Sequence, residues 1–189
     1  MRLVFIGPPG AGKGTQAKWL TGHLSIPHLS TGEMLREVMA EGGDLGQAAQ
    51  KFVSDGKLVP DDLVIQIVND RLQDEDCRAG FLLDGFPRTL AQAKALQQLL
   101  EARNEPLDFV ISLSVPDETL LERMLQRGRE DDSVVVIKKR FDVFHAETKP
   151  LLEHYNNSGL LHTLDGTGSP DEVRQRILQL LEQPGPAAD

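Results

Sequence analysis

Short apolar runs alternate along the chain with longer segments in which apolar residues recur every three or four positions. A short apolar run between turn-forming residues is typical of a buried strand, and a spacing of three or four is typical of a helix. The runs predict five strands, at residues 3–6, 27–30, 81–83, 109–113 and 160–164. Because strands and helices alternate, the pattern predicts an α/β fold with a parallel sheet covered by helices on both faces.

The segments between these strands differ in how clearly they predict helices. Residues 60–72 repeat apolar positions at a spacing of four after a proline and two aspartates, which predicts a helix and its start. One long helix is predicted from Ser133 to Tyr155. The region from Ser30 to Val59 reads as two helices without a strand of its own. We therefore expect that region to be an insert over the ligand-binding edge of the sheet.

A glycine-rich segment, Gly7-Pro-Pro-Gly-Ala-Gly-Lys-Gly-Thr15, joins the first predicted strand to the first predicted helix. Glycines allow consecutive backbone N–H groups to converge on one anion, and the helix start adds partial positive charge. The positive charge of Lys13 at this helix start is unfavourable unless an anion is bound beside it. The segment therefore predicts a P-loop that binds nucleotide phosphates. It departs from the general pattern because Gly14 follows the lysine and the hydroxyl is on Thr15.

Composition limits the classes of protein to which this chain can belong. With 189 residues and 40% hydrophobic content, the chain suits one domain with a substantial core. A net charge of −9 argues against nucleic acid or an anionic membrane as a partner. The single cysteine, Cys77, excludes an internal disulfide and a multi-cysteine zinc site, and its charged neighbours predict a solvated loop. No apolar run resembles a signal peptide or a membrane span, so a cytoplasmic location is expected.

Several arginines occupy positions where a positive charge is unfavourable for the folded chain by itself. Arg123 has no acidic neighbour one turn away on its predicted helix, and Arg127 lies one turn after it. Arg140 lies on an apolar helix face, where an unpaired charge would cost several kcal/mol. Arg88 precedes a helix start, where the helix dipole opposes a cation. A long-range salt bridge could explain each one singly, but together they indicate binding of anionic groups.

Asp84 follows the predicted strand 81–83, at the edge of the sheet where the P-loop is also expected. A carboxylate at that place can hold Mg²⁺, directly or through water. The alternative is an aspartate that only caps a turn with Gly85. The histidines show no metal-ligand spacing and are interpreted as surface or half-buried residues.

Taken together, these residues resemble the adenylate kinase family over nearly the whole chain. The likeness is carried by spaced segments in one order: 7–15, 29–36, 55–60, 81–88 with Gln92, 127–132 and 138–140. It implies a P-loop NTPase-type fold with a five-stranded parallel sheet, helices on both faces, an AMP-binding helical insert and a short lid. The implied division is a single kinase domain, 1–189, with a core of 1–29, 60–126 and 134–189, an insert at about 30–59 and a lid at about 127–133.

The resemblance also implies roles for individual residues. The ATP site would comprise Gly10, Ala11, Gly12, Lys13, Gly14, Thr15, Arg123, Arg127 and Gly168. The AMP site would comprise Thr31, Arg36, Lys57, Leu58, Val59, Gly85, Phe86, Pro87, Arg88, Gln92, Arg129 and Arg140. The catalytic set would be Lys13, Arg88, Arg123, Arg129 and Arg140, with Asp84 holding Mg²⁺ through water.

The lid and the base pocket distinguish this chain within the family. The segment after Arg127 is short and has no cysteine, so it resembles the short-lid form without structural zinc. Thr31 and Gln92 resemble the adenine-reading pair, because a glutamine amide offers a donor and an acceptor to one base edge. Pyrimidine-specific relatives tend to have Ala and Asn at these places.

The implied reaction is MgATP + AMP ⇌ MgADP + ADP, by direct in-line transfer without a covalent intermediate. The acceptor is already an anionic phosphate oxygen, so no general base is required. Catalysis would consist of positioning and charge neutralisation. The expected partners are ATP, AMP and ADP, and the family suggests a monomer. One alternative is a UMP/CMP kinase or another nucleoside monophosphate kinase, and another is a nucleotide-binding module without turnover.

Overall fold

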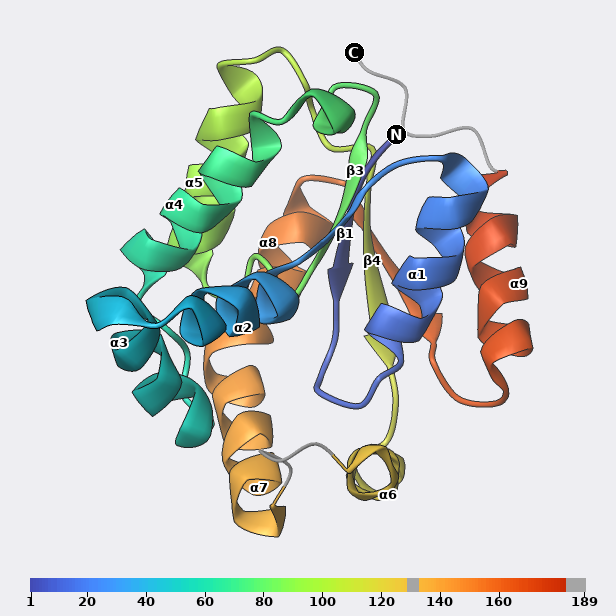
Figure 1. Ribbon diagram of the computed structural model, residues 1–189. Coiled ribbons are helices and arrows are strands. Elements are labelled where there is room, and N and C mark those ends of the chain that lie inside the picture. Colours follow the sequence, from blue (N-terminus) through green and yellow to red (C-terminus); the bar gives the residue numbers. More distant parts are fainter. Residues whose placement is uncertain (129–132, 183–189) are drawn as a thin grey trace.

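The computed structural model describes residues 1–128 and 133–182, and it contains a five-stranded, wholly parallel sheet (Figure 1). The strands are β1 (Arg2–Ile6), β2 (His28–Ser30), β3 (Phe81–Asp84), β4 (Phe109–Ser114) and β5 (Leu161–Asp165). Their order in the sheet is β2-β3-β1-β4-β5. The prediction of a parallel five-stranded α/β fold is therefore confirmed. The order places the end of β1, and the P-loop that follows it, in the middle of the sheet.

Two helical layers cover the sheet because successive strand residues point to opposite faces. The helices are α1 (Lys13–Leu24), α2 (Thr31–Glu41), α3 (Gly43–Ser54), α4 (Asp61–Leu72), α5 (Leu90–Glu101), α6 (Asp117–Arg127), α7 (Val134–Val143), α8 (Pro150–Asn157) and α9 (Pro170–Leu181). Leu3 and Phe5 of β1 pack with α1 and α9, on one face. Val4 and Ile6 pack with α4, α5 and α8, on the other. Figure 1 shows these two groups of helices on opposite sides of the strands.

The predicted insert contains the two expected helices, α2 and α3, and no strand between them. Figure 1 shows both of them beyond the edge of the main helical layer, toward the end of the molecule where the strands finish. The side chain of Ser30 accepts a hydrogen bond from the backbone of Glu33 and so marks the start of α2. That this region moves as a separate unit stays a prediction.

The expectation of one long helix from Ser133 to Tyr155 is wrong. A π-helical turn, Phe144–Thr148, separates α7 from α8. Pro150 begins α8 and, having no N–H, cannot continue an α-helical hydrogen-bond pattern from the preceding turn. The backbone N–H of Lys149 instead donates to the carbonyl of Phe144, five residues back. The wider turn places Thr148 against the loop that carries Arg88, whose carbonyl accepts a hydrogen bond from the Thr148 hydroxyl.

The expectation that Cys77 lies in a solvated loop is also wrong. The residue is only 2% exposed and belongs to the apolar cluster beneath β3. It ends a 3₁₀ turn, Glu75–Cys77, whose acidic residues face solvent while the thiol points inward. Arg71 explains the arrangement, since its guanidinium contacts both Asp76 and the Cys77 sulfur.

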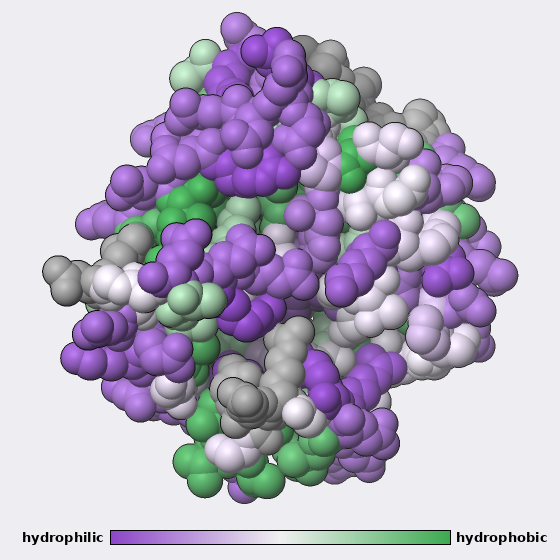
Figure 2. Space-filling view, in the orientation of Figure 1, coloured by the Kyte–Doolittle hydropathy of each residue, from purple (hydrophilic) through white to green (hydrophobic). Residues whose placement is uncertain are grey.

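The surface is mostly hydrophilic on the face shown in Figure 2, with apolar residues gathered over α7. Val134 and Val135 are exposed there. Within residues 1–128 and 133–182, the helices are all too short or too polar to cross a bilayer.

Candidate active site

A pocket of about 670 Å³ opens where β1 and β3 end. This volume suits a small organic ligand. Its lining includes the following predicted site residues: Gly10, Ala11, Gly12, Lys13, Gly14, Thr15, Thr31, Arg36, Lys57, Leu58, Val59, Asp84, Gly85, Pro87, Arg88, Gln92, Arg123, Arg127, Arg140 and Gly168. The fold thus brings together residues from both halves of the chain in one cavity.

Two predicted site residues are not part of this lining. Phe86 is fully buried and packs in the apolar cluster with α4 and α5, so it supports the loop from below. Arg129 lies outside the residues that the structure describes. The predicted lid, 127–133, likewise falls mostly outside them.

The P-loop leaves β1 and enters α1 through glycines whose backbone is in the left-handed region. Gly10 has a φ of +85°, and a Cβ at this position would lie 2.9 Å from the carbonyl oxygen of Leu120. Gly12 has a φ of +94° and precedes the first residue of α1, Lys13. The loop therefore combines left-handed glycines with a helix start, which is the geometry that directs backbone N–H groups to an anion.

Lys13 is held inside its own loop. Its ammonium donates hydrogen bonds to the carbonyl oxygens of Gly7, at 2.7 Å, and Pro8, at 2.9 Å. Burial lowers the pKa of Lys13 to about 8, and the neighbouring Asp84 carboxylate only partly opposes that shift. Burial removes the ammonium from the water that would stabilise its charge, and a phosphate bound in the pocket would stabilise that charge instead.

Asp84 ends β3 beside the P-loop, because β3 pairs with β1 and Asp84 lies opposite Phe5. Burial tends to raise the pKa of Asp84, but contact with His28 and the charge of Lys13 outweigh burial and lower it. His28 begins β2, and its Nε2 lies 3.4 Å from the Asp84 Oδ2. Sequence interpretation missed this neighbour, since a lone histidine before a short strand carries no signal of its own.

An ionised carboxylate next to a P-loop lysine fits Mg²⁺, which takes one or two protein carboxylates together with substrate phosphates and water. In the described ranges, groups of three or more histidine, cysteine, aspartate or glutamate side chains that could hold a metal are absent. Asp84 is a carboxylate of the pocket lining whose lowered pKa fits such an ion.

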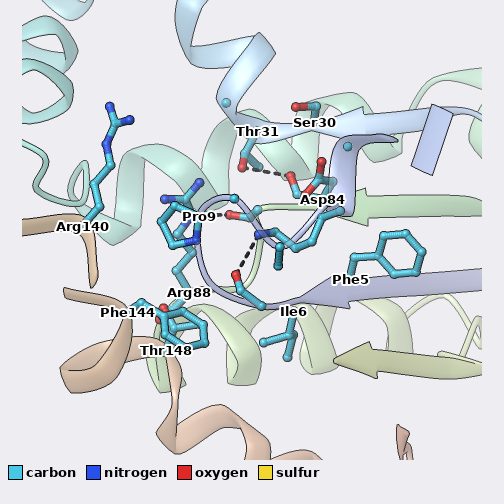
Figure 3. Close-up of a pocket in the computed structure, with 18 of the residues that line it drawn as sticks. Phe5, Ile6, Pro9, Ser30, Thr31, Asp84, Arg88, Arg140, Phe144 and Thr148 are labelled. Atoms are coloured by element: carbon cyan, nitrogen blue, oxygen red, sulfur yellow. Dashed lines mark hydrogen bonds between the residues drawn. The ribbon is translucent and has the colours of Figure 1, made fainter. Parts of the chain in front are cut away.

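The loop after β3 is tightly packed around Gly85. Its φ is +84°, and a Cβ would lie 2.8 Å from the Thr31 hydroxyl and 3.0 Å from the Arg88 guanidinium. The Thr31 hydroxyl donates to the carbonyl of Asp84 at 3.3 Å, and Arg88 Nε donates to the carbonyl of Gly85 at 2.8 Å. Figure 3 shows Thr31, Asp84 and Arg88 converging on the pocket. The glycine lets the start of α2, the end of β3 and the Arg88 side chain meet at one point.

Gln92 lies in the first turn of α5 and is only 1% exposed. Its Oε1 accepts a hydrogen bond of 2.7 Å from the backbone N–H of Arg88. Its Nε2 donates at 2.7 Å to Oδ1 of Asp61, a residue that sequence interpretation did not single out. Both ends of the amide are thus held by protein groups next to the pocket.

Arginines reach the pocket from three helices, α2, α6 and α7, and from the loop after β3. Arg123 of α6 donates to the carbonyl oxygens of Gly166, at 3.1 Å, and Gly168, at 3.5 Å. This contact joins α6 to the loop after β5. Arg140 reaches the pocket from α7, and Figure 3 shows it on a different segment from Arg88. With Lys13 and Arg127, these side chains give the pocket several cations in a protein whose net charge is −9.

Comparison with known proteins places these features in a family. A family model described as adenylate kinase matches residues 5–160. A relative from Bartonella tribocorum named "Adenylate kinase" is 50% identical, over 94% of this chain and 97% of its own. Relatives of the same name from Nocardia farcinica and Clostridium botulinum are 48% and 43% identical, each over 96% of this chain and 99% of its own.

These relatives also differ in length. The alignment with the Clostridium botulinum protein extends over 212 positions, whereas that with the Nocardia farcinica protein extends over 181 for the same share of this chain. The Clostridium protein therefore carries residues that this chain lacks. A length of 189 residues is consistent with the short-lid form.

Proposed function

The chain belongs to the adenylate kinase family and transfers a phosphoryl group from ATP to AMP to give two ADP, and we propose that the pocket at the ends of β1 and β3 is where this transfer occurs. The transfer would proceed by direct in-line attack. The observation that supports this proposal most strongly is the pocket itself. It is lined by the P-loop at one side and by Thr31, Gly85 and Gln92 at the other, so two nucleotides can meet in it.

ATP would occupy the side of the P-loop. Backbone N–H groups of residues 10–15 would bind its phosphates at the start of α1, and Lys13 would leave its carbonyl partners to contact them. Gly168, whose carbonyl accepts a hydrogen bond from Arg123, would approach the adenine, and Arg123 itself would contact ATP. Arg127 would add positive charge at the phosphates.

AMP would occupy the side of α2 and the loop after β3. Arg36, Arg88 and Arg140 would bind its phosphate, and Arg129 would join them from the lid. Residues 57–59 and 85–87 would enclose the nucleoside, with Phe86 acting from beneath the surface. Thr31 and Gln92 would read the base, since the Gln92 amide lines the pocket and can offer a donor and an acceptor.

Chemistry in this pocket requires charge neutralisation rather than proton transfer. The attacking atom is an anionic phosphate oxygen of AMP, so none of the residues has to remove a proton. Lys13, Arg88 and Arg123 would stabilise the charge that spreads over the transferring phosphoryl group. Mg²⁺, held by Asp84 through water and by the ATP phosphates, would supply further neutralisation of phosphate charge.

Water competes with AMP as an acceptor, so the pocket has to close during transfer. We propose that the insert at about 30–59 and the short lid at about 127–133 close over a core formed by 1–29, 60–126 and 134–189. Gly42 between α2 and α3 and Gly43 at the start of α3 both have positive φ and would provide a bending point on the insert side. We further propose a cytoplasmic, monomeric enzyme without structural zinc, nucleic acid or membrane as partners.

Product analysis tests this function. The protein is incubated with MgATP and, separately, AMP, CMP, UMP, GMP or no acceptor, and the nucleotides are resolved by ion-exchange chromatography. Two ADP formed per AMP consumed, with slow transfer to the other acceptors and little hydrolysis, supports the proposal. Preference for CMP or UMP would favour a pyrimidine monophosphate kinase, and absence of transfer would favour a binding module.

A further inference from the structure

Asp61 is not among the site residues that the family resemblance implies. Its carboxylate nevertheless accepts two hydrogen bonds from neighbouring side chains. Asp61 is the first residue of α4, where the partial positive charge of the helix start stabilises a carboxylate. Its Oδ2 accepts a hydrogen bond of 2.8 Å from the Thr89 hydroxyl, and its Oδ1 accepts one of 2.7 Å from Gln92 Nε2. Asp61 thus joins the start of α4 to the start of α5.

The partners of Gln92 determine which way its amide points. The backbone N–H of Arg88 can only donate, so it must meet the amide oxygen. The Asp61 carboxylate can only accept, so it must meet the amide nitrogen. A rotated amide would set two donors against each other at Arg88 and two acceptors against each other at Asp61. The backbone N–H of Gln92 is fixed as well, since it donates to the Thr89 hydroxyl at 3.2 Å.

This fixed orientation has a consequence for the base that the pocket accepts. The amide still has one N–H and one oxygen lone pair available to a ligand, and the positions of this donor and this acceptor are fixed. A 6-aminopurine presents a ring acceptor beside an amino donor, whereas a 6-oxopurine presents a ring donor beside an oxygen acceptor. An amide that could rotate would match either edge, but an amide that is held can match only one. A wrong base would leave buried polar groups unpaired, which is the strongest form of rejection available to a pocket.

We propose that Asp61 is a positioning residue for base specificity, which holds the Gln92 amide in the orientation that accepts a 6-aminopurine monophosphate and rejects a 6-oxopurine monophosphate. This inference rests on the proposed function, in which Gln92 reads the base of the acceptor nucleotide. Asp61 itself acts through Gln92. Its role depends on being a hydrogen-bond acceptor, and not on its charge.

The experiment compares AMP and IMP as acceptors, with MgATP as the donor. It uses the wild type, Asp61→Ala and Asp61→Asn. Asp61→Ala removes the acceptor, so we expect the AMP-to-IMP ratio of kcat/KM to fall about three- to tenfold, mainly through a higher KM for AMP. An asparagine oxygen can still accept from Gln92 while its NH₂ donates to the Thr89 hydroxyl. Asp61→Asn is therefore expected to keep a ratio close to that of the wild type.

Asp62→Ala is the matched control, because Asp62 lies in the same first helical turn, is exposed and leaves Thr89 and Gln92 untouched. We expect it to keep the wild-type ratio. Asp61→Ser, whose side chain is too short to reach Gln92, provides the same comparison if Asp61→Ala does not fold. A purely structural role would lower kcat/KM for AMP and IMP alike and leave their ratio unchanged.

The inference is overturned if Asp61→Ala keeps the wild-type ratio within about twofold, or if Asp61→Asn loses as much of it as Asp61→Ala. The second outcome would show that charge at the start of α4 matters and the hydrogen bond does not. Failure of the wild type to phosphorylate AMP would instead contradict the proposed function, so the two failures are distinguishable.

Discussion

Lys13 Nζ lies 2.7 Å from the carbonyl oxygen of Gly7, so the P-loop closes on its own lysine. The side chain is therefore already curled over the loop that would receive the ATP phosphates. A bound phosphate and these carbonyls are competing partners for one ammonium group.

Replacing Lys13 with methionine is expected to lower kcat by a factor on the order of 10² to 10⁵, because a cation at the transferring phosphoryl group is lost. The rate of ADP formation from MgATP and AMP measures the effect. Lys94→Met is the control, since Lys94 is an exposed residue of α5 outside the pocket lining. Near-normal turnover in Lys13→Met would contradict the proposed mechanism.

The same substitution is expected to stabilise the ligand-free protein near pH 7. The pKa of Lys13 is about 8 in the folded protein, below its ordinary value of 10.5, so the charged side chain opposes folding. This cost is fully present below pH 8 and disappears as the pH rises toward 10.5, because the unfolded chain then binds more protons. The gain should be at most about 3 kcal/mol, since two hydrogen bonds to carbonyls are lost with the charge.

Urea unfolding of wild type and Lys13→Met at pH 7 and pH 9.5 measures this difference. The variant should be the more stable protein at pH 7, and the gap should narrow at pH 9.5 as the wild type gains stability. A gap that stays constant or widens with pH would show that Lys13 is not desolvated in the folded protein.

Replacing Asp84 with asparagine is expected to weaken the binding of Mg²⁺ during the reaction. A neutral amide attracts the ion less than a carboxylate whose lowered pKa keeps it ionised. The Mg²⁺ concentration that gives half-maximal rate should rise about tenfold or more, as a loss of about 1.4 kcal/mol or more in binding would produce. Asp70→Asn, at an exposed position of α4, is the control. An unchanged Mg²⁺ dependence would assign Asp84 to a purely structural role.

Substitution of Gly85 by alanine is expected to damage both stability and the AMP site. The new Cβ would lie 2.8 Å from the Thr31 hydroxyl, at a φ of +84° that side chains disfavour. We expect a loss of about 1–3 kcal/mol in unfolding free energy and a higher KM for AMP, with KM for ATP less affected. Thermal unfolding and steady-state kinetics measure the two effects.

Gly22→Ala is the matched control for that substitution. Gly22 lies inside α1 with open space around it, so alanine there should stabilise the helix by about 0.5–1 kcal/mol. If Gly85→Ala behaved like Gly22→Ala, the close packing around Gly85 would not matter for AMP binding.

Much of this site could be predicted from local sequence because its parts depend on local chemistry. The P-loop is a contiguous segment in which glycines, a lysine and a helix start act together, and the structure has it between β1 and α1. The strands could be predicted as well, because each buried strand is a contiguous apolar run in the sequence. The break at Phe144–Thr148 was missed because apolar spacing continues through it, although Pro150 was a signal that a helix could not run on undisturbed.

The sequence by itself determined the order of strands and helices along the chain, the anion-binding loop and the acidic side chain that ends β3. Only the tertiary structure decided which distant side chains meet. Asp61 contacts Gln92 across 31 residues, and His28 contacts Asp84 because β2 lies beside β3 in the sheet. The periodicity of one segment records which of its faces is buried, but it carries no information on which segment packs against that face. The partners of Gln92 and Asp84, and hence their orientation and charge, follow from the packing of whole elements.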